Sequence, residues 1–315
     1  MKAAFKELKD GKQSKVFIEN DVDIPKLDKY SVLVSVKACG LSCNEDKVLK
    51  VLYKDQSKIK YPVCYEVAGV VVEVGDWVTT VDCGDEVVGL IPLDYGQSGC
   101  AEYVRLSEYD VTKKPQNVSF VDAAGCIGDA VKAYTGLHYL GRLTSGDTVL
   151  VMDGASSFGA TAIQLAQHWG AKESGGLGID LVLDSGVMQF AETSHRILLR
   201  EDAYEHLVPS KHDIVSCLAV GGRWITSKSD LQLDPPHSQM MFMKCASIGF
   251  LFEQAWILSS TQQGRYLHIL MDIMEKVSSG VIRPHVHHTV PFEAVPDVLQ
   301  NLTGKRLGKV VMKMK

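Results

Sequence analysis

The chain has 315 residues, of which 23% are charged and 46% hydrophobic, and its formal net charge is -5. This length suits two domains, and the apolar content is sufficient for ordinary buried cores. The acidic balance excludes an electrostatic footprint for direct binding of nucleic acid or of an anionic membrane surface. The opening MKAAFKELKD has no apolar signal region, and no later stretch is long and apolar enough to cross a bilayer. We therefore expect a cytoplasmic protein without a transmembrane segment.

The first third of the chain predicts a small β domain. Short β-rich runs alternate there with Gly and Asp turns. Between two of these runs, Cys43–Tyr53 has the charge and leucine spacing of a short helix, which we expect to pack across the sheet end. The predicted strands are Ser31–Ala38, Val63–Gly75, Asp85–Ile91 and Cys100–Leu106.

After Pro115 the pattern changes to alternating helices and strands. Helical spacing over Ser119–Leu140 precedes an apolar strand at Thr148–Asp153 and a second helix at Thr161–Trp169, which is a βα order. A long amphipathic helix is predicted at Gln263–Ser278. The remaining predictions are strands at Ile179–Leu183, Arg223–Thr226, Ala246–Phe250 and Gly308–Lys313, and a loop at Ser227–Gln239 around Pro235–Pro236.

The cysteines and histidines do not form a metal-binding pattern. Eight cysteines are scattered without a CxxC pair, which favours reduced thiols over a disulfide framework. Cys39, Cys43 and Cys64 have irregular spacing, and buried free cysteine is the commoner explanation for such a set. His285, His287 and His288 are interpreted as a polar loop after Pro284. No metal site is therefore predicted.

One turn carries the residues typical of a nucleotide site. Gly154-Ala155-Ser156-Ser157-Phe158-Gly159 joins the strand at Thr148–Asp153 to the following helix. Small residues at such a turn let backbone N–H groups and the positive helix end approach a pyrophosphate. Ser156 stands where the central glycine is expected, and its hydroxyl offers a donor, so we expect a weakened site. Any βα unit also favours small residues where helix meets strand, so this motif alone leaves both interpretations open.

Several motifs together resemble the zinc-free quinone oxidoreductase (zeta-crystallin) branch of the medium-chain dehydrogenases. The resemblance covers most of the chain and runs in family order. The residues that carry it are VKACGLS at 36–42, EVAGVVVEVG at 66–75, GDEVVG at 84–89, AYTGL at 133–137, SGDTVL at 145–150 with the turn that follows, and GKVV at 308–311.

The resemblance implies an α/β protein with two domains. A GroES-like catalytic β domain is expected over residues 1–118, rejoined by 283–315, and a Rossmann-like doubly wound parallel sheet over 119–282. The implied cofactor is NADP(H). The implied cofactor-binding residues are Gly154, Ala155, Ser156, Ser157, Phe158 and Gly159 of the turn, together with Gly186.

The catalytic positions of the family are altered in this chain. Ser42 and Tyr65 stand where alcohol dehydrogenases of the family have zinc ligands, and neither is a normal zinc ligand, so no zinc is expected. Ser42, Lys47 and Lys132 replace the residues that the family places near the nicotinamide. The catalytic residues are thus unknown, with Ser42 and Lys132 as pocket candidates. Lys132 either pairs with a phosphate or quinone oxygen, or extends its ammonium to solvent from the helix.

The segment after Lys172 is too short for a complete dinucleotide fold. The second and third strands of such a fold need on the order of forty residues. Asp184 would be the ribose-binding acid if Ile179–Leu183 were the second strand, but residues 175–184 resemble the family's fourth strand far better. We therefore predict a sheet that lacks its second and third strands and has an exposed edge. If the deletion is native, NADP(H) binding is expected to be weak or lost.

Two functional hypotheses follow from the resemblance. The first is an NADP(H)-dependent, zinc-independent reductase of small quinones or enones, with a degenerate pocket. The second is a non-catalytic subunit, because close relatives on this branch are associated with an early-endosomal, Rab-linked complex that handles messenger RNA. The family also implies a homodimer through edge strands of the cofactor domain.

Overall fold

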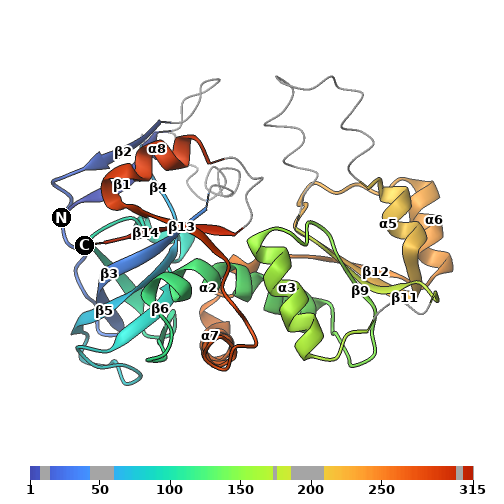
Figure 1. Cartoon of the computed structure of the whole chain (residues 1–315), viewed down its shortest axis with the longest axis horizontal. Coiled ribbons are helices and arrows are strands. Elements are labelled where there is room, and N and C mark those ends of the chain that lie inside the picture. Colours follow the sequence, from blue (N-terminus) through green and yellow to red (C-terminus); the bar gives the residue numbers. More distant parts are fainter. Residues whose placement is uncertain (8–14, 43–59, 173–175, 186–208, 303–307, 315) are drawn as a thin grey trace. The chain divides into compact units, whose positions relative to one another are not determined.

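The computed structural model describes residues 1–7, 15–42, 60–172, 176–185, 209–302 and 308–314. These residues form two compact units (Figure 1). The first contains Met1–Gly128 and Gln254–Leu302 with the C-terminal strand, and the second contains Asp129–Glu253. The domain boundaries inferred from the sequence stay a prediction. The helix expected at Cys43–Tyr53 lies outside the described residues.

The first unit is built on a large mixed sheet. Its order is β13-β14-β3-β5-β6-β8, and β7 also pairs with β3. Strands β3, β5, β6 and β7 confirm the four strands predicted from the sequence. The bounds are β3 Ser31–Leu41, β5 Glu66–Val74, β6 Glu86–Leu90, β7 Tyr103–Ser107, β8 Val111–Lys113, β13 Val286–Pro291 and β14 Lys309–Lys313.

A smaller antiparallel sheet of the first unit was not predicted. It has the order β2-β1-β4, with β1 at Ala3–Glu7, β2 at Lys15–Glu19 and β4 at Tyr61–Pro62. Apolar side chains of this unit form one core, whose members include Val34, Val67, Leu106 and Val290. The short helix α8, Val295–Gln300, contributes the buried Val295 and Leu299.

Two of the three grouped histidines lie on a strand, so their interpretation as a loop was wrong, whereas His285 precedes the strand. His287 and His288 belong to β13, which pairs in parallel with the C-terminal β14. Only Val290 is buried in β13, so the strand has no apolar alternation that a sequence pattern could detect. Its partner β14 is a separate strand, and local periodicity does not reveal which strands pair.

The second unit contains a four-stranded parallel sheet in the order β12-β11-β10-β9. The strands are β9 Val149–Val151, β10 Ile179–Asp184, β11 Leu218–Thr226 and β12 Ser247–Phe250. Because β10 lies directly between β9 and β11, it occupies the place of the fourth strand in a doubly wound sheet. The assignment of Ile179–Leu183 as the fourth strand agrees with this order, and among the described residues no strand two or three lies beside β9.

A remnant of the second strand remains beside β9. Thr148 and Lys172 form a single parallel bridge, and the amide of Lys172 donates to the carbonyl of Asp147 at 2.9 Å. The described chain continues in strand form only at β10, on the other side of β9. Leu150 of β9 is 40% exposed, as expected for a strand whose outer neighbour is lost.

The helices of the chain follow the predicted order with one correction. The predicted helix at Ser119–Leu140 is confirmed as α2, Phe120–Tyr134, extended by a π-helical turn at Thr135–Leu140. Helix α7 spans Gln263–Ser278, as predicted. The loop predicted at Ser227–Gln239 was wrong at its end, because α6 covers Pro235–Met243. Proline fits the first positions of a helix, where its missing N–H has no intrahelical role.

Two further helices belong to the described part of the second unit. Helix α3 covers Ser157–His168 and begins four residues earlier than predicted, within the glycine-containing turn. Helix α5 covers Lys211–Cys217. Among the helices of the described residues, none combines the length and the apolar composition that a membrane span requires.

Candidate cofactor site

The predicted nucleotide turn joins the end of β9 to the start of α3. Asp153 adopts the left-handed backbone conformation, with φ of 59°, and thereby reverses the chain after the strand. A Cβ atom at Gly159 would lie 2.2 Å from the carbonyl oxygen of Asp153 and 2.7 Å from Cα of Gly154. Only glycine therefore allows α3 to pack this closely on the turn, which is the role of the third glycine in a dinucleotide-binding motif.

Ser156 caps the helix rather than leaving its hydroxyl open. Its Oγ accepts a hydrogen bond from the N–H of Gly159 at 3.0 Å and donates one to the carbonyl of Asp153 at 2.8 Å. The hydroxyl that the sequence offered to a phosphate is thus already engaged within the turn. A pyrophosphate would have to displace Ser156 from the Gly159 amide or use the amides of Ser157 and Phe158, which open the helix and have no preceding helical carbonyl.

Lys132 and the turn, both predicted from the sequence, are brought together. The Nζ atom of Lys132, near the end of α2, lies 5.1 Å from the ring centroid of Phe158. Phe158 itself is buried, at 5% exposure, in the first turn of α3. A cation over an aromatic ring is held by the ring's electrostatic field. The contact places a positive charge beside the positive end of α3, which increases the attraction of this site for an anion.

The same turn carries an acidic group that opposes an anion. Desolvation of its carboxyl raises the pKa of Asp153, while hydrogen bonding with Ser156 acts in the opposite direction. When ionised, this carboxylate repels a phosphate at the helix end. The turn therefore combines attraction from Lys132 and the helix with repulsion from Asp153.

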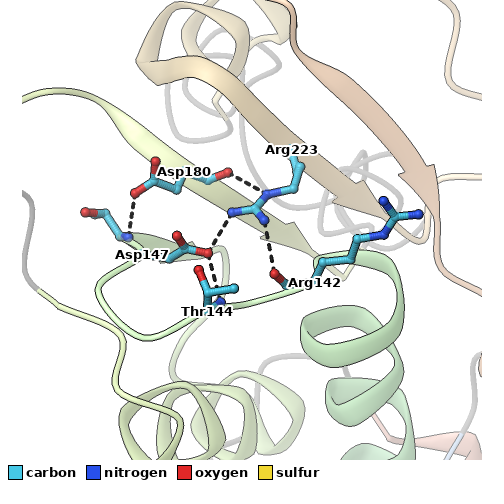
Figure 2. Close-up of polar contacts among 6 residues, drawn as sticks. Arg142, Thr144, Asp147, Asp180 and Arg223 are labelled. Atoms are coloured by element: carbon cyan, nitrogen blue, oxygen red, sulfur yellow. Dashed lines mark hydrogen bonds and ion pairs between the residues drawn. The ribbon is translucent and has the colours of Figure 1, made fainter.

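The base of the parallel sheet is held by an arginine network (Figure 2). Arg223 of β11 donates to the carbonyls of Asp180 at 3.3 Å and Arg142 at 3.2 Å, and to Oδ2 of Asp147 at 2.8 Å. Asp147 also accepts from the amide of Thr144 at 3.0 Å. Desolvation at Asp147 is outweighed by the hydrogen bonds from Thr144 and Arg223, so the pKa of Asp147 is lowered. The network ties the loop before β9 to β10 and β11, and so keeps the truncated sheet aligned.

Asp184 does not present a free carboxylate for a ribose. It ends β10 with 1% exposure, and its Oδ2 accepts a hydrogen bond from the Thr226 hydroxyl at 2.8 Å. This geometry links β10 to β11 and agrees with the assignment of β10 as the fourth strand.

Ser42 and Tyr65, at the family's zinc positions, belong to the first unit. The carbonyl of Ser42 accepts from the thiol of Cys64 at 3.8 Å. Tyr65 is 1% exposed, and its hydroxyl donates to the carbonyl of Pro62 at 3.3 Å. Gly186 and Lys47, which complete the predicted set, lie outside the described residues.

The thiols of this region show what sequence spacing missed. Cys39 and Cys64 lie together, as part of a group whose third member is Cys100. Cys43, which the sequence placed with them, lies outside the described residues. The intervals between the three cysteines are long and uneven, so only the strand pairing of the folded unit reveals the cluster.

Comparison with known proteins agrees with the motifs. Residues 28–116 match the family of alcohol dehydrogenase GroES-like domains. The chain is 40% identical to quinone oxidoreductase-like protein 1 of Mus musculus over 316 aligned residues, covering 88% of each protein. It is 30% identical to 2-methylene-furan-3-one reductase of Solanum lycopersicum, over 94% of this chain and 74% of that protein.

Solved structures share the fold of the chain. An alcohol dehydrogenase superfamily protein from Novosphingobium aromaticivorans matches with a TM-score of 0.80 at 19% identity, over 100% of both chains. The quinone oxidoreductase from Coxiella burnetii matches with a TM-score of 0.73 at 20% identity, over 100% of this chain and 99% of that one.

Proposed function

We propose a function on the basis that the chain belongs to the medium-chain dehydrogenase/reductase family as a quinone oxidoreductase-like member. The proposed function is that of a zinc-independent, NADP(H)-dependent reductase with a weakened cofactor site. The single observation that carries the proposal is the β9–α3 turn, where Gly159 allows close packing and Lys132 adds positive charge. When bound, NADPH supplies the hydride that reduces a quinone or the conjugated double bond of an enone.

The residues of the turn fit a pyrophosphate in part. The amides of Ser157 and Phe158 would donate to its oxygens, with Lys132 as the neighbouring cation. The adenosine side does not fit equally well, because the described sheet has no strand beyond Lys172 at its β9 edge. We therefore expect an affinity well below that of a complete dinucleotide fold, and the preference for NADP(H) over NAD(H) rests on the family alone.

Names of relatives support the proposed substrate class. One relative is named a quinone oxidoreductase and another a 2-methylene-furan-3-one reductase, whose named compound is an enone. Zinc independence is supported by Ser42 and by Tyr65, whose phenol is buried and donates to a backbone carbonyl. Neither residue is a usual zinc ligand. The reaction would be carried by positioning of the two reactants and exclusion of water.

Turnover by the full-length chain tests this proposal. NADPH oxidation would be followed with a 1,4-quinone and, separately, with an enone, before and after treatment with a metal chelator. The proposal predicts slow, acceptor-dependent oxidation that the chelator does not reduce. Oxidation no faster than in buffer with both acceptors would contradict it.

A second candidate function is favoured by the truncated sheet. Among the described residues, no strand lies beyond β9 and Leu150 of β9 is partly exposed, which supports a partner protein at this edge. The second candidate is a non-catalytic subunit of an early-endosomal, Rab-linked complex involved in mRNA transport. Such a subunit would require the fold but not hydride transfer. Purification of the tagged chain from cells, probed for early-endosomal Rab proteins, tests this role, and their absence together with measurable turnover would exclude it.

We also propose a homodimer formed through the β12 edge of the sheet. Phe242, Met243 and Phe250 are 84%, 80% and 56% exposed, and they lie at the end of α6 and on β12. Large exposed apolar side chains on an edge strand and on the helix that precedes it in the chain favour an interface there. Light scattering should give the mass of two chains, reduced to one by Phe242→Asp and Phe250→Asp. A monomeric mass for the unaltered chain would contradict the proposal. Such a dimer is expected in the cytoplasm.

A further inference from the structure

Three thiols meet in the interior of the first unit. The Sγ atoms of Cys39, Cys64 and Cys100 all lie within 4.8 Å of one another. Cys39 comes from β3, Cys64 follows β4, and Cys100 precedes β7. Their exposures are 0%, 1% and 0%, so water does not reach the cluster. Among the described residues, no other group of three cysteine, histidine or acidic side chains is placed closely enough to share an ion.

The backbone holds these thiols in place at a conformational cost. Cys64 has a φ of 58°, a region that side chains other than Asn, Asp and Gly rarely adopt. Its carbonyl accepts from the amide of Gly99 at 2.8 Å, which joins the two loops of the cluster. A Cβ atom at Gly99 would lie 2.9 Å from Sγ of Cys39. A residue that its neighbours hold in a rarely populated backbone conformation, as Cys64 is held here, is a feature often found at functional sites.

Each of the three cysteines offers one sulfur ligand to an ion, and these ligand atoms already lie close together. A thiolate in an apolar interior lacks a compensating charge, which a bound cation would supply.

We propose that Cys39, Cys64 and Cys100 form a binding site for a soft monovalent metal ion, Cu(I). Three sulfurs at about 2.3 Å from one ion stand about 4 Å apart, so the observed group needs only a small contraction. Thiolate ligands select soft ions such as Cu(I), whereas structural Zn²⁺ takes four ligands and this group offers three. Binding replaces thiol protons by the ion and releases them to solvent, so the affinity increases with pH.

Exposed thiols must be separated from the buried cluster in the test. Among the cysteines of the described residues, Cys83 and Cys245 are the exposed ones and so the most accessible to adventitious copper. The double variant Cys83→Ser/Cys245→Ser is therefore the reference protein. On this background, Cys39→Ser, Cys64→Ser and Cys100→Ser each remove one sulfur from the cluster.

The measurement is an anaerobic titration of the reduced full-length reference protein with Cu(I) against a coloured Cu(I) chelator. The proposal predicts one ion per chain, bound more tightly at pH 8 than at pH 6, and at least a tenfold loss of affinity in each cluster variant. X-ray absorption of the loaded reference protein should show sulfur ligands alone, and this readout does not depend on the folding of any variant. Failure of the reference protein to compete with the chelator, or nitrogen or oxygen ligands in the absorption spectrum, would overturn the proposal.

Discussion

The ammonium of Lys132 lies 5.1 Å from the ring centroid of Phe158, which joins the end of α2 to the first turn of α3. One of these residues was predicted as a pocket candidate and the other as part of the nucleotide turn. Their contact places a positive charge where the helix end already favours an anion.

Replacing this charge should weaken NADPH binding without unfolding the protein. We expect Lys132→Gln to raise the dissociation constant roughly threefold to tenfold, since one charge near a helix end contributes about 1 kcal/mol. The effect should shrink as salt is added, because the interaction is screened. Isothermal titration at two salt concentrations measures it. Lys172→Gln, an exposed lysine of the same unit, is the control, and an equal loss in that variant would show that only net charge matters.

Ser156 should affect stability and cofactor affinity in opposite directions. Its Oγ occupies the Gly159 amide, so Ser156→Gly frees that donor for a pyrophosphate and is expected to increase NADPH affinity. Ser156→Ala should lower the free energy of unfolding by about 1 kcal/mol through loss of the cap, and Ser156→Gly by a few tenths of that. Urea denaturation and NADPH titration of both variants test the two effects. Unchanged affinity in Ser156→Gly would indicate that the cap does not compete with the cofactor.

Asp110 should make the stability of the first unit depend on pH. Burial raises the pKa of Asp110 to about 7, with backbone hydrogen bonding to Ser107 acting against it. Because the folded protein favours the protonated acid, stability is full below the ordinary pKa of 3.8 and decreases as the pH rises towards 7. Asp110→Asn should therefore raise the melting temperature at pH 8 and change it little at pH 4. Asp21→Asn, at an exposed position, is the control. A variant that is destabilised equally at both pH values would refute this assignment.

Removal of the Arg223 guanidinium should loosen the parallel sheet. The side chains of Arg223 and Asp147 are 22% and 17% exposed, so Arg223→Met leaves a largely buried carboxylate without its cation. We expect a loss of about 2 kcal/mol in the free energy of unfolding at pH 7, partly recovered by adding Asp147→Asn. Arg142→Met is the matched control, because only the carbonyl of Arg142 joins the network (Figure 2). Equal losses in both single variants would contradict the role of the ion pair.

Local patterns in the sequence predicted much of the architecture. The apolar stripe of α7 and the strand at Ile179–Leu183 were visible because each element carries its own periodicity or flanking glycines. The missing strands were predicted from the short segment after Lys172 together with the resemblance of residues 175–184 to the family's fourth strand. Features set by contacts between separate elements were missed, including the pairing of β13 with β14 and the approach of Cys100 to Cys39.

Parts of the candidate site also depended on geometry. The sequence identified Ser156 as a donor to a phosphate, but its role as a helix cap follows from a hydrogen bond of 3.0 Å to Gly159. The position of Lys132 on the helix could not distinguish a solvent-directed side chain from one held over Phe158. The orientation of the Lys132 side chain depends on how α2 and α3 pack against each other, and the sequence pattern of one helix does not specify this packing.

The central claim is that the amides opening α3 still bind the pyrophosphate of NADPH. Ser157→Pro removes one of these donors at the first helical position, where proline is tolerated and where Ser156 already has an extended backbone. Lys211→Pro makes the same change at the first position of α5, whose cap Ser210 has a matching conformation.

Fluorescence titration of NADPH against the full-length chain and these two variants is the most direct test. We predict saturable binding of NADPH to the unaltered chain, with a dissociation constant in the micromolar to millimolar range. Ser157→Pro should lower the affinity approximately tenfold, as expected for the loss of a charge-assisted hydrogen bond, and Lys211→Pro should not change it. Absence of any saturable signal from the unaltered chain at millimolar NADPH, or equal binding by Ser157→Pro, would contradict it.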